Sequence, residues 1–310
     1  MRERAMMFGT QGDLVGILTE ARSDESGTSD VGVIFLNSGI LHRVGANRLH
    51  VTLARRLAER GFSGFRFDHA GIGDSGSRKD DRPFRESAIA EVREAMDVLQ
   101  ETRGLSRFVL AGLCSGSDMG YWTSLEDDRV TGLIQLDPFV YRTRRFLLRY
   151  YGPRLVSPGA WWRSATARIR SARSAWKDRR GEGGMDPDWA MPEYTRVFPP
   201  RAEVAAGLGE LCGRDVRFFV FISGAMRSIV NHAEQYERSF PEVEFGDRLT
   251  VQFRPGTDHM VSGLEAREEL VHDIAMWMVR HWGSGVSEAS ASADAAWKGA
   301  EALAPSGGDR

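Results

Sequence analysis

Residues 107–118 read RFVLAGLCSGSD. Their first part, Arg107–Leu113, is a short and mostly apolar run, which is typical of a buried β-strand. Cys114 follows at once, with Gly112 two residues before it and Gly116 two residues after it. A sharp turn between a strand and a helix crowds the backbone, so small residues are needed at these two positions. The stretch therefore predicts a strand, a strained turn that displays Cys114, and a helix.

Cys114 is the candidate nucleophile. The helix that follows it places positive potential at its N-terminus, which favours a thiolate. The backbone N–H of Ser115 is expected to face a developing oxyanion. The alternative is that Cys114 is a small buried hydrophobic residue, which is the common role of a free cysteine. Ser115 and Ser117 are rival nucleophiles by residue type, but neither has glycine at both offsets.

The rest of the chain alternates strand-like runs with helical patterns. This alternation predicts an α/β fold in which a mostly parallel sheet carries helices on both faces. The first two strands are expected to form a hairpin. Strands are predicted at residues 6–8, 14–20, 31–37, 62–68, 107–113, 130–137, 216–223 and 249–254. Helices are predicted at residues 47–60, 85–103, 117–125 and 264–282.

Residues 139–210 interrupt the alternation, because they show no clear strand pattern. We interpret them as a cap or lid inserted into a core formed by residues 1–138 and 211–282. Residues 283–310 are small and polar, and we expect a disordered tail there. The side chains that we expect to line an acyl pocket in the cap are Phe146, Leu147, Leu148, Tyr150 and Tyr151.

Three further motifs resemble those of the α/β-hydrolase superfamily, and the resemblance covers about residues 6–282. Residues 36–40 (LNSGI) follow a strand, where the superfamily has its oxyanion loop. Residues 67–75 (FDHAGIGDS) match its Asp-x-x-Gly-x-Gly-x-Ser loop, and residues 254–259 (RPGTDH) stand where it keeps the catalytic histidine. More narrowly, the chain resembles a cysteine-containing branch of bacterial serine-aminopeptidase-like hydrolases and acyltransferases. Some members of that branch accompany polysaccharide-export or specialised-metabolite genes.

The resemblance implies roles for particular residues. His259 becomes the candidate base, although it could also be a surface-loop histidine. The backbone N–H of Ile40 joins that of Ser115 as a candidate oxyanion-hole donor. Dienelactone hydrolases also use cysteine in this turn, but they are typically shorter and lack so long a cap.

The catalytic acid is the point at which this chain departs from the superfamily. Its usual place is the turn at residues 224–228, which reads GAMRS and contains no carboxylate. Asp137, at the end of the strand predicted over 130–137, keeps the order nucleophile, acid, histidine. It could equally be a turn-forming residue before Pro138. Glu234 is a weaker candidate, and a Cys–His dyad without an acid is also chemically acceptable because a thiol ionises readily.

Two residues after the oxyanion loop, His42 and Arg43, are candidates for lining the pocket or binding a substrate carboxylate. A structural pair is an equally good reading of them. Asp68, Asp74 and Asp258 are expected to hold their own loops through local hydrogen bonds.

A basic segment extends from Arg142 to Arg180, with twelve Lys/Arg residues and one acidic residue, Asp178. It is either a solvated helical face or a docking surface for an anionic partner, such as acyl carrier protein or a coenzyme A thioester. Its tryptophans, Trp161, Trp162 and Trp176, add cation–π capacity. Nucleic acid is a remote third option, since the segment has no recognised nucleic-acid motif.

Composition sets broader expectations. The net charge of −2 gives no general attraction to nucleic acid or membrane, and no apolar run is long enough to span a bilayer. Two cysteines do not make a disulfide framework, so we expect a soluble cytoplasmic protein. The histidines lack metal-ligand spacing and the glycine-rich stretches do not open a dinucleotide site, so neither a metal nor a redox cofactor is expected.

The sequence thus predicts acyl-transfer chemistry, as acyltransferase or thioesterase, through a Cys acyl-enzyme on ester or thioester substrates. Sulfur favours transfer because exchange between a substrate thioester and an enzyme thioester is nearly thermoneutral. The alternatives are a hydrolase of small esters, lactones or amides, and a catalytically silent α/β-hydrolase scaffold.

Overall fold

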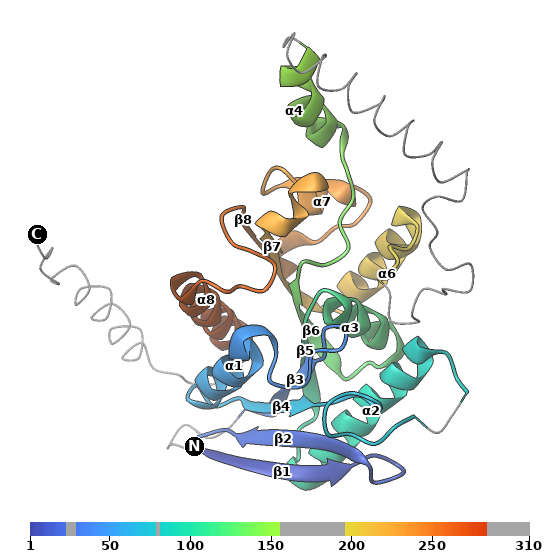
Figure 1. Ribbon diagram of the computed structural model, residues 1–310, viewed down its shortest axis with the longest axis vertical. Coiled ribbons are helices and arrows are strands. Elements are labelled where there is room, and N and C mark those ends of the chain that lie inside the picture. The colour runs from blue at the N-terminus through green and yellow to red at the C-terminus, as the bar shows by residue number, and fades with distance from the viewer. Residues whose placement is uncertain (23–28, 79–80, 156–195, 284–310) are drawn as a thin grey trace, which may run out of the picture.

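The computed structural model describes residues 1–22, 29–78, 81–155 and 196–283 (Figure 1). Its strands form one eight-stranded sheet in the order β1-β2-β4-β3-β5-β6-β7-β8. The predicted α/β class, with a mostly parallel sheet, is confirmed. The strands are β1 (Arg2–Phe8), β2 (Leu14–Glu20), β3 (Val31–Leu36), β4 (Ser63–Phe67), β5 (Arg107–Leu113), β6 (Val130–Leu136), β7 (Arg217–Ser223) and β8 (Leu249–Arg254).

Strand direction gathers the candidate residues at one edge of the sheet. β1 and β2 form the predicted antiparallel hairpin, and β2 runs antiparallel to β4. From β4 through β3 to β8, each neighbouring pair is parallel. The segments that follow β3, β5, β6 and β8 therefore emerge on the same side, which is where ligand sites of open α/β sheets lie.

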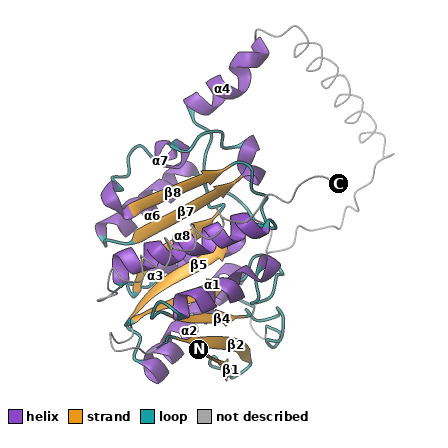
Figure 2. Ribbon diagram, turned by 90° about the vertical axis from the view of Figure 1, so that its left-hand side faces the viewer, coloured by secondary structure: helices purple, strands orange, loops and turns teal. Residues whose placement is uncertain are grey.

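Helices cover both faces of this sheet, as Figures 1 and 2 show. α1 (Leu49–Ala58) and α8 (Leu264–Trp282) lie against one face. α2 (Phe84–Arg103), α3 (Ser115–Glu126) and α6 (Arg201–Gly213) lie against the other. Side chains of β3 alternate between the two buried clusters, as the period of a strand buried on both faces requires.

Most predicted boundaries agree with these elements to within two residues. The helix predicted over 47–60 begins differently, with a short 3-10 turn, η1 (Ala46–Arg48), before α1. Asn47 and Arg48 have φ values of 49° and 64°, so this backbone does not continue into α1 as a regular helix. The helix after the turn at Cys114 starts at Ser115, two residues earlier than predicted.

The structure describes only part of the predicted cap, namely residues 139–155 and 196–210. α4 (Arg144–Leu155) projects away from the sheet in Figure 1. α6 instead packs on α3: Val204 and Leu208 are buried in the core, and the Tyr121 hydroxyl donates to the Val204 carbonyl over 3.2 Å. Residues 201–210, which the prediction assigned to the cap, thus belong to the helical layer over the sheet.

Several sequence-based expectations fall outside the described residues. They are the three cap tryptophans, most of the basic segment and the tail from residue 284 onward. In the part of the chain that the structure describes, no helix combines the length and apolar character needed to cross a membrane. Three short elements connect the last strands: η2 (Gly224–Ser228), α7 (Gln235–Ser239) and η3 (Gly246–Arg248).

Candidate active site

Cys114 lies on a strained turn between β5 and α3. Its φ of 56° and ψ of −119° are costly for a residue with a side chain. Hydrogen bonds fix the turn: the Cys114 N–H donates to the Leu136 carbonyl over 2.9 Å, and the Asp118 N–H donates to the Cys114 carbonyl over 3.1 Å. A Cβ on Gly112 would lie 2.2 Å from the carbonyl carbon of Gly116, so the tightness of the turn requires glycine there.

His259 and Asp137 meet at the carboxyl edge of the sheet. His259 follows β8, and its Nδ1 lies 2.6 Å from Oδ2 of Asp137, which follows β6. The Asp137 carboxylate is fully buried. Ser223, the last residue of β7, holds it through an N–H bond of 2.7 Å to Oδ1 and a hydroxyl bond of 2.6 Å to Oδ2. The carboxylate is thus fixed in a position that orients the imidazole.

The imidazole and the thiol favour a charged pair. The hydrogen bond to Asp137, followed by the one to Cys114, raises the pKa of His259 to about 10 against the opposing effect of burial. Burial alone would raise the pKa of the Cys114 thiol. The hydrogen bond with His259 and the positive charge of Arg196 outweigh it, so the pKa of Cys114 is lowered. Both shifts favour the charged forms, a thiolate at Cys114 and an imidazolium at His259.

Glu234, the other candidate acid, lies elsewhere. Its exposed carboxylate is 2.6 Å from Arg145 of α4 and 2.9 Å from Arg238 of α7. The structure therefore brings Asp137, and not Glu234, to His259.

The two expected oxyanion-hole donors lie on segments that touch. The Gly39 N–H, in the loop after β3, donates to the Ser115 hydroxyl at the start of α3 over 2.7 Å. This bond joins the segment that contains Ile40 to the turn at Cys114. Ile40 itself is 73% exposed, next to this contact.

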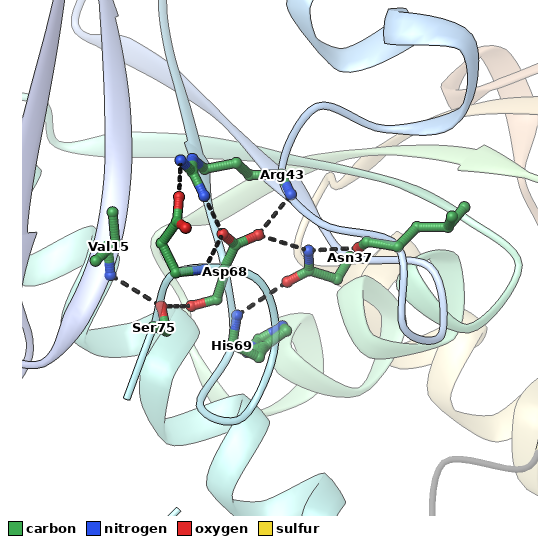
Figure 3. A network of polar contacts seen from close by, with 8 residues as sticks. Val15, Asn37, Arg43, Asp68, His69 and Ser75 are labelled. Carbon is green, nitrogen blue, oxygen red and sulfur yellow. Dashed lines mark hydrogen bonds and ion pairs between the residues drawn. The ribbon is translucent and has the colours of Figure 1, made fainter. Parts of the chain in front are cut away.

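Figure 3 shows how that loop is anchored from below. Asp68, buried after β4, accepts from the backbone N–H of Arg43 over 2.5 Å and from the Asn37 amide over 3.3 Å. The Arg43 guanidinium contacts the carboxylates of both Asp68 and Asp74. This geometry favours the structural reading of Arg43 over binding of a substrate carboxylate.

The remaining predicted residues are more peripheral. The His42 side chain is exposed, and its backbone carbonyl accepts from Gly45 over 3.0 Å. The carboxylate of Asp258 accepts from the backbone N–H groups of Met260 and Ser262 over 2.9 and 3.0 Å, so it holds its own loop as expected.

Sequence reasoning missed two residues beside the sulfur. Arg196 Nη1 lies 3.8 Å from Cys114 Sγ, and its guanidinium forms a two-bonded ion pair with Asp118. Asp118 carried a usable signal, because it lies in the first turn of the helix that follows Cys114. Arg196 carried none, since it lies in a stretch without strand or helix periodicity.

Comparison with known proteins identifies solved structures with a similar fold. No protein-family model matches the sequence, and no curated protein matches it. An esterase from Pyrococcus furiosus is similar in structure, with 14% identity, 90% of each chain covered and a TM-score of 0.54. An α/β hydrolase from Penicillium sp. sh18 has 16% identity and a TM-score of 0.52, with 91% of this chain and 99% of that chain covered.

A third similar structure is a lidless α/β serine hydrolase from Xanthomonas campestris. It is 15% identical, with a TM-score of 0.50, and the match covers 93% of this chain and 98% of that chain. At such identities the likeness is one of fold. Together with the sheet order and the turn at Cys114, it shows that this chain has the α/β-hydrolase fold.

Proposed function

We propose that this chain is an acyl-transfer enzyme, an acyltransferase or a thioesterase, that works through a thioester on Cys114. The observation that carries the proposal is the set of Asp137, His259 and Cys114 on three strand ends, with 2.6 Å between Asp137 and His259. The interaction of His259 with the thiol also lowers the pKa of Cys114. Nucleophile, base and orienting acid in this relation are the machinery of acyl transfer.

The first half-reaction consumes the charged pair. The Cys114 thiolate forms a bond to the substrate carbonyl carbon, and the electron pair of the C=O bond moves to oxygen. The backbone N–H groups of Ile40 and Ser115 stabilise this oxyanion. When the oxygen re-forms the carbonyl, the bond to the leaving group breaks. The leaving group takes the proton of the His259 imidazolium, which leaves a thioester and a neutral imidazole.

The second half-reaction restores the pair. Neutral His259 removes a proton from the acceptor, which is an alcohol, an amine, a thiol or water. The acceptor attacks the thioester carbonyl, and the tetrahedral intermediate expels the Cys114 thiolate. Asp137 favours this step because its carboxylate stabilises the imidazolium that forms.

A simple ester hydrolase is the second candidate. The Pyrococcus furiosus neighbour is an esterase, and the same three residues would serve that reaction with water as the acceptor. The silent-scaffold alternative draws its support from the turn after β7, which has no carboxylate. Asp137, 2.6 Å from His259, weakens that support.

Intact-mass spectrometry with acyl-coenzyme A thioesters and nitrophenyl esters of matched acyl chain length tests the proposal. We expect a mass increase equal to the acyl group, located at Cys114 by peptide mapping. We also expect faster acylation by the thioester than by the oxygen ester of the same acyl group. Loss of turnover in Cys114→Ala serves as the readout if the adduct is too short-lived to accumulate.

Cys212→Ala is the matched control, because Cys212 is the other cysteine and is buried in α6. It should keep both the adduct and the turnover. Full turnover by Cys114→Ala would contradict the proposal. Acylation by nitrophenyl esters alone, followed by release to water, would favour the ester hydrolase.

A further inference from the structure

Arg196 lies beside the candidate nucleophile, but it takes no part in the two proposed half-reactions. Its Nη1 lies 3.8 Å from Cys114 Sγ, which is within reach of an N–H···S contact. Its other donors are directed away from the sulfur: Nε and Nη2 bond to the two oxygens of Asp118 over 2.6 and 2.7 Å. One edge of the guanidinium is therefore held by a carboxylate while another donor faces the sulfur.

Asp118 is a firm anchor for this arrangement. It lies in the first turn of α3, its backbone N–H bonds to the Cys114 carbonyl over 3.1 Å, and its side chain is buried. A bidentate pair with a carboxylate fixes the plane of a guanidinium, which a single contact does not. Because the backbone of Asp118 is bonded to that of Cys114, the pair keeps Arg196 next to the sulfur.

Aromatic rings complete the setting of Arg196. Its guanidinium carbon lies 4.7 Å from the ring centre of Phe198 and 5.3 Å from that of Phe139. Cation–π contacts of this kind stabilise the guanidinium and exclude water from its faces. A cation screened from water acts more strongly on a nearby charge than one in bulk solvent.

We propose that Arg196, positioned by Asp118, stabilises the thiolate of Cys114 both at rest and as it leaves the thioester. This inference rests on the proposed role of Cys114 as nucleophile. The charge of His259 changes during the reaction, since it is neutral in the thioester enzyme and becomes an imidazolium again only when it takes the proton of the acceptor. The guanidinium of Arg196 keeps its charge throughout, so it adds a second positive charge beside the sulfur as the C–S bond breaks.

The charged groups that act on the sulfur are His259, Arg196 and Asp118, and their effects have different signs. His259 and Arg196 lower the pKa of the thiol, whereas the negative charge of Asp118 raises it. If Asp118 acted only through its charge, its removal would make Cys114 more acidic. If it positions Arg196, its removal makes Cys114 less acidic. The two cases predict opposite shifts.

Alkylation by iodoacetamide as a function of pH, followed at the Cys114 peptide by mass spectrometry, measures this shift. Arg196→Gln should raise the thiol pKa by about one unit and slow alkylation about tenfold at a pH below both pKa values. Asp118→Asn should shift the pKa in the same direction. Arg201→Gln is the matched control, because Arg201 lies five residues away and pairs with exposed Glu242 on the surface.

A thiol pKa unchanged in Arg196→Gln would overturn the inference. A lower thiol pKa in Asp118→Asn would overturn the positioning role of that carboxylate. Both results are independent of the acyl adduct: if the wild-type thiol is reactive but accepts no acyl group, the proposed function fails and the alkylation profile still decides the role of Arg196. Deacylation that is slower in Arg196→Gln than in Arg201→Gln is the expected kinetic counterpart.

Discussion

Asp137 stands at a different strand end from the one that usually carries the acid, yet it reaches the same imidazole. It follows β6, whereas the expected turn follows β7, and the two strands are parallel neighbours. Their carboxyl ends therefore open at one edge of the sheet. Ser223, at the end of β7, does not supply a carboxylate itself. It donates two hydrogen bonds to the carboxylate of Asp137. The carboxylate at His259 thus stands one strand away from the turn where the superfamily resemblance places the acid.

The pKa of His259 should report this contact directly. We expect the wild-type imidazole to stay protonated through neutral pH and to titrate near 10, because the carboxylate of Asp137 stabilises its charged form. In Asp137→Asn the pKa should fall toward the ordinary value of about 6.5. The ring C–H resonance in an NMR titration measures both values.

The raised pKa of His259 should also make the free energy of unfolding depend on pH. A folded-state pKa raised above the unfolded value adds stability that is fully present below about pH 6.5 and is lost as the pH rises through about 10. The stability advantage of wild type over Asp137→Asn should therefore shrink across this window. An advantage that grows with pH there would contradict the assignment.

Sequence reasoning could place Cys114, His259 and Asp137 at one edge of the sheet, because each follows a strand that the hydrophobic pattern predicts. The catalytic roles of His259 and Asp137 come from the resemblance and stay predictions. Sequence reasoning could not find Ser223 or Arg196. The role of Ser223 depends on which strands become neighbours, and the role of Arg196 depends on where a segment without periodicity folds back. The local spacing of residues predicts neither.

At the scale of elements, the β5–turn–α3 unit was predicted best, because steric necessity leaves its sequence little freedom. Helix α6 was not predicted. Its sequence, RAEVAAGLGELCG, contains three glycines and little amphipathic contrast. Gly207 is needed where α6 crosses α3, since a Cβ there would lie 2.1 Å from the Tyr121 hydroxyl. The packing partner, and not the helix's own periodicity, accounts for this residue.

Gly116 offers a test of the steric argument at the turn. A Cβ on Gly116 would lie 2.6 Å from the Asn37 carbonyl oxygen and 2.8 Å from that of Leu36, and backbone cannot yield as a flexible side chain can. Gly116→Ala should therefore lower the free energy of unfolding by about 1–3 kcal/mol and displace the loop that contains Ile40. Urea denaturation and the rate of Cys114 acylation measure the two effects.

The matched control is Gly209→Ala in α6, where a Cβ would meet nothing within 4 Å. Because alanine is the better helix former, this change should raise the free energy of unfolding by about 0.5–1 kcal/mol. Equal effects of the two substitutions would show that the turn tolerates a side chain and that the close approach to β3 is not required.

At the scale of the whole molecule, charge is distributed unevenly. The chain is nearly neutral, with a net charge of −2, yet one stretch concentrates twelve basic residues. Some of these charges are already compensated, as Arg145 is by Glu234. Arg144 and Arg149 are exposed on α4, which projects from the sheet, so both are open to an anionic partner (Figure 1).

We therefore expect α4 to contribute to docking of an acidic acyl carrier protein. Double charge reversal, Arg144→Glu with Arg149→Glu, should lower kcat/KM for a carrier-bound acyl group about tenfold at low salt, because electrostatic steering is lost. The same acyl group on a small uncharged thiol should react unchanged, since the site at Cys114 is intact. Raised ionic strength should reduce the difference in kcat/KM between wild type and variant for the carrier-bound acyl group. Arg2→Glu with Arg4→Glu on β1, where both arginines are exposed, changes the net charge by the same amount and is the control. Equal losses with both substrates would place these arginines in the fold of the cap, and unchanged kcat/KM with both would exclude α4 from carrier docking.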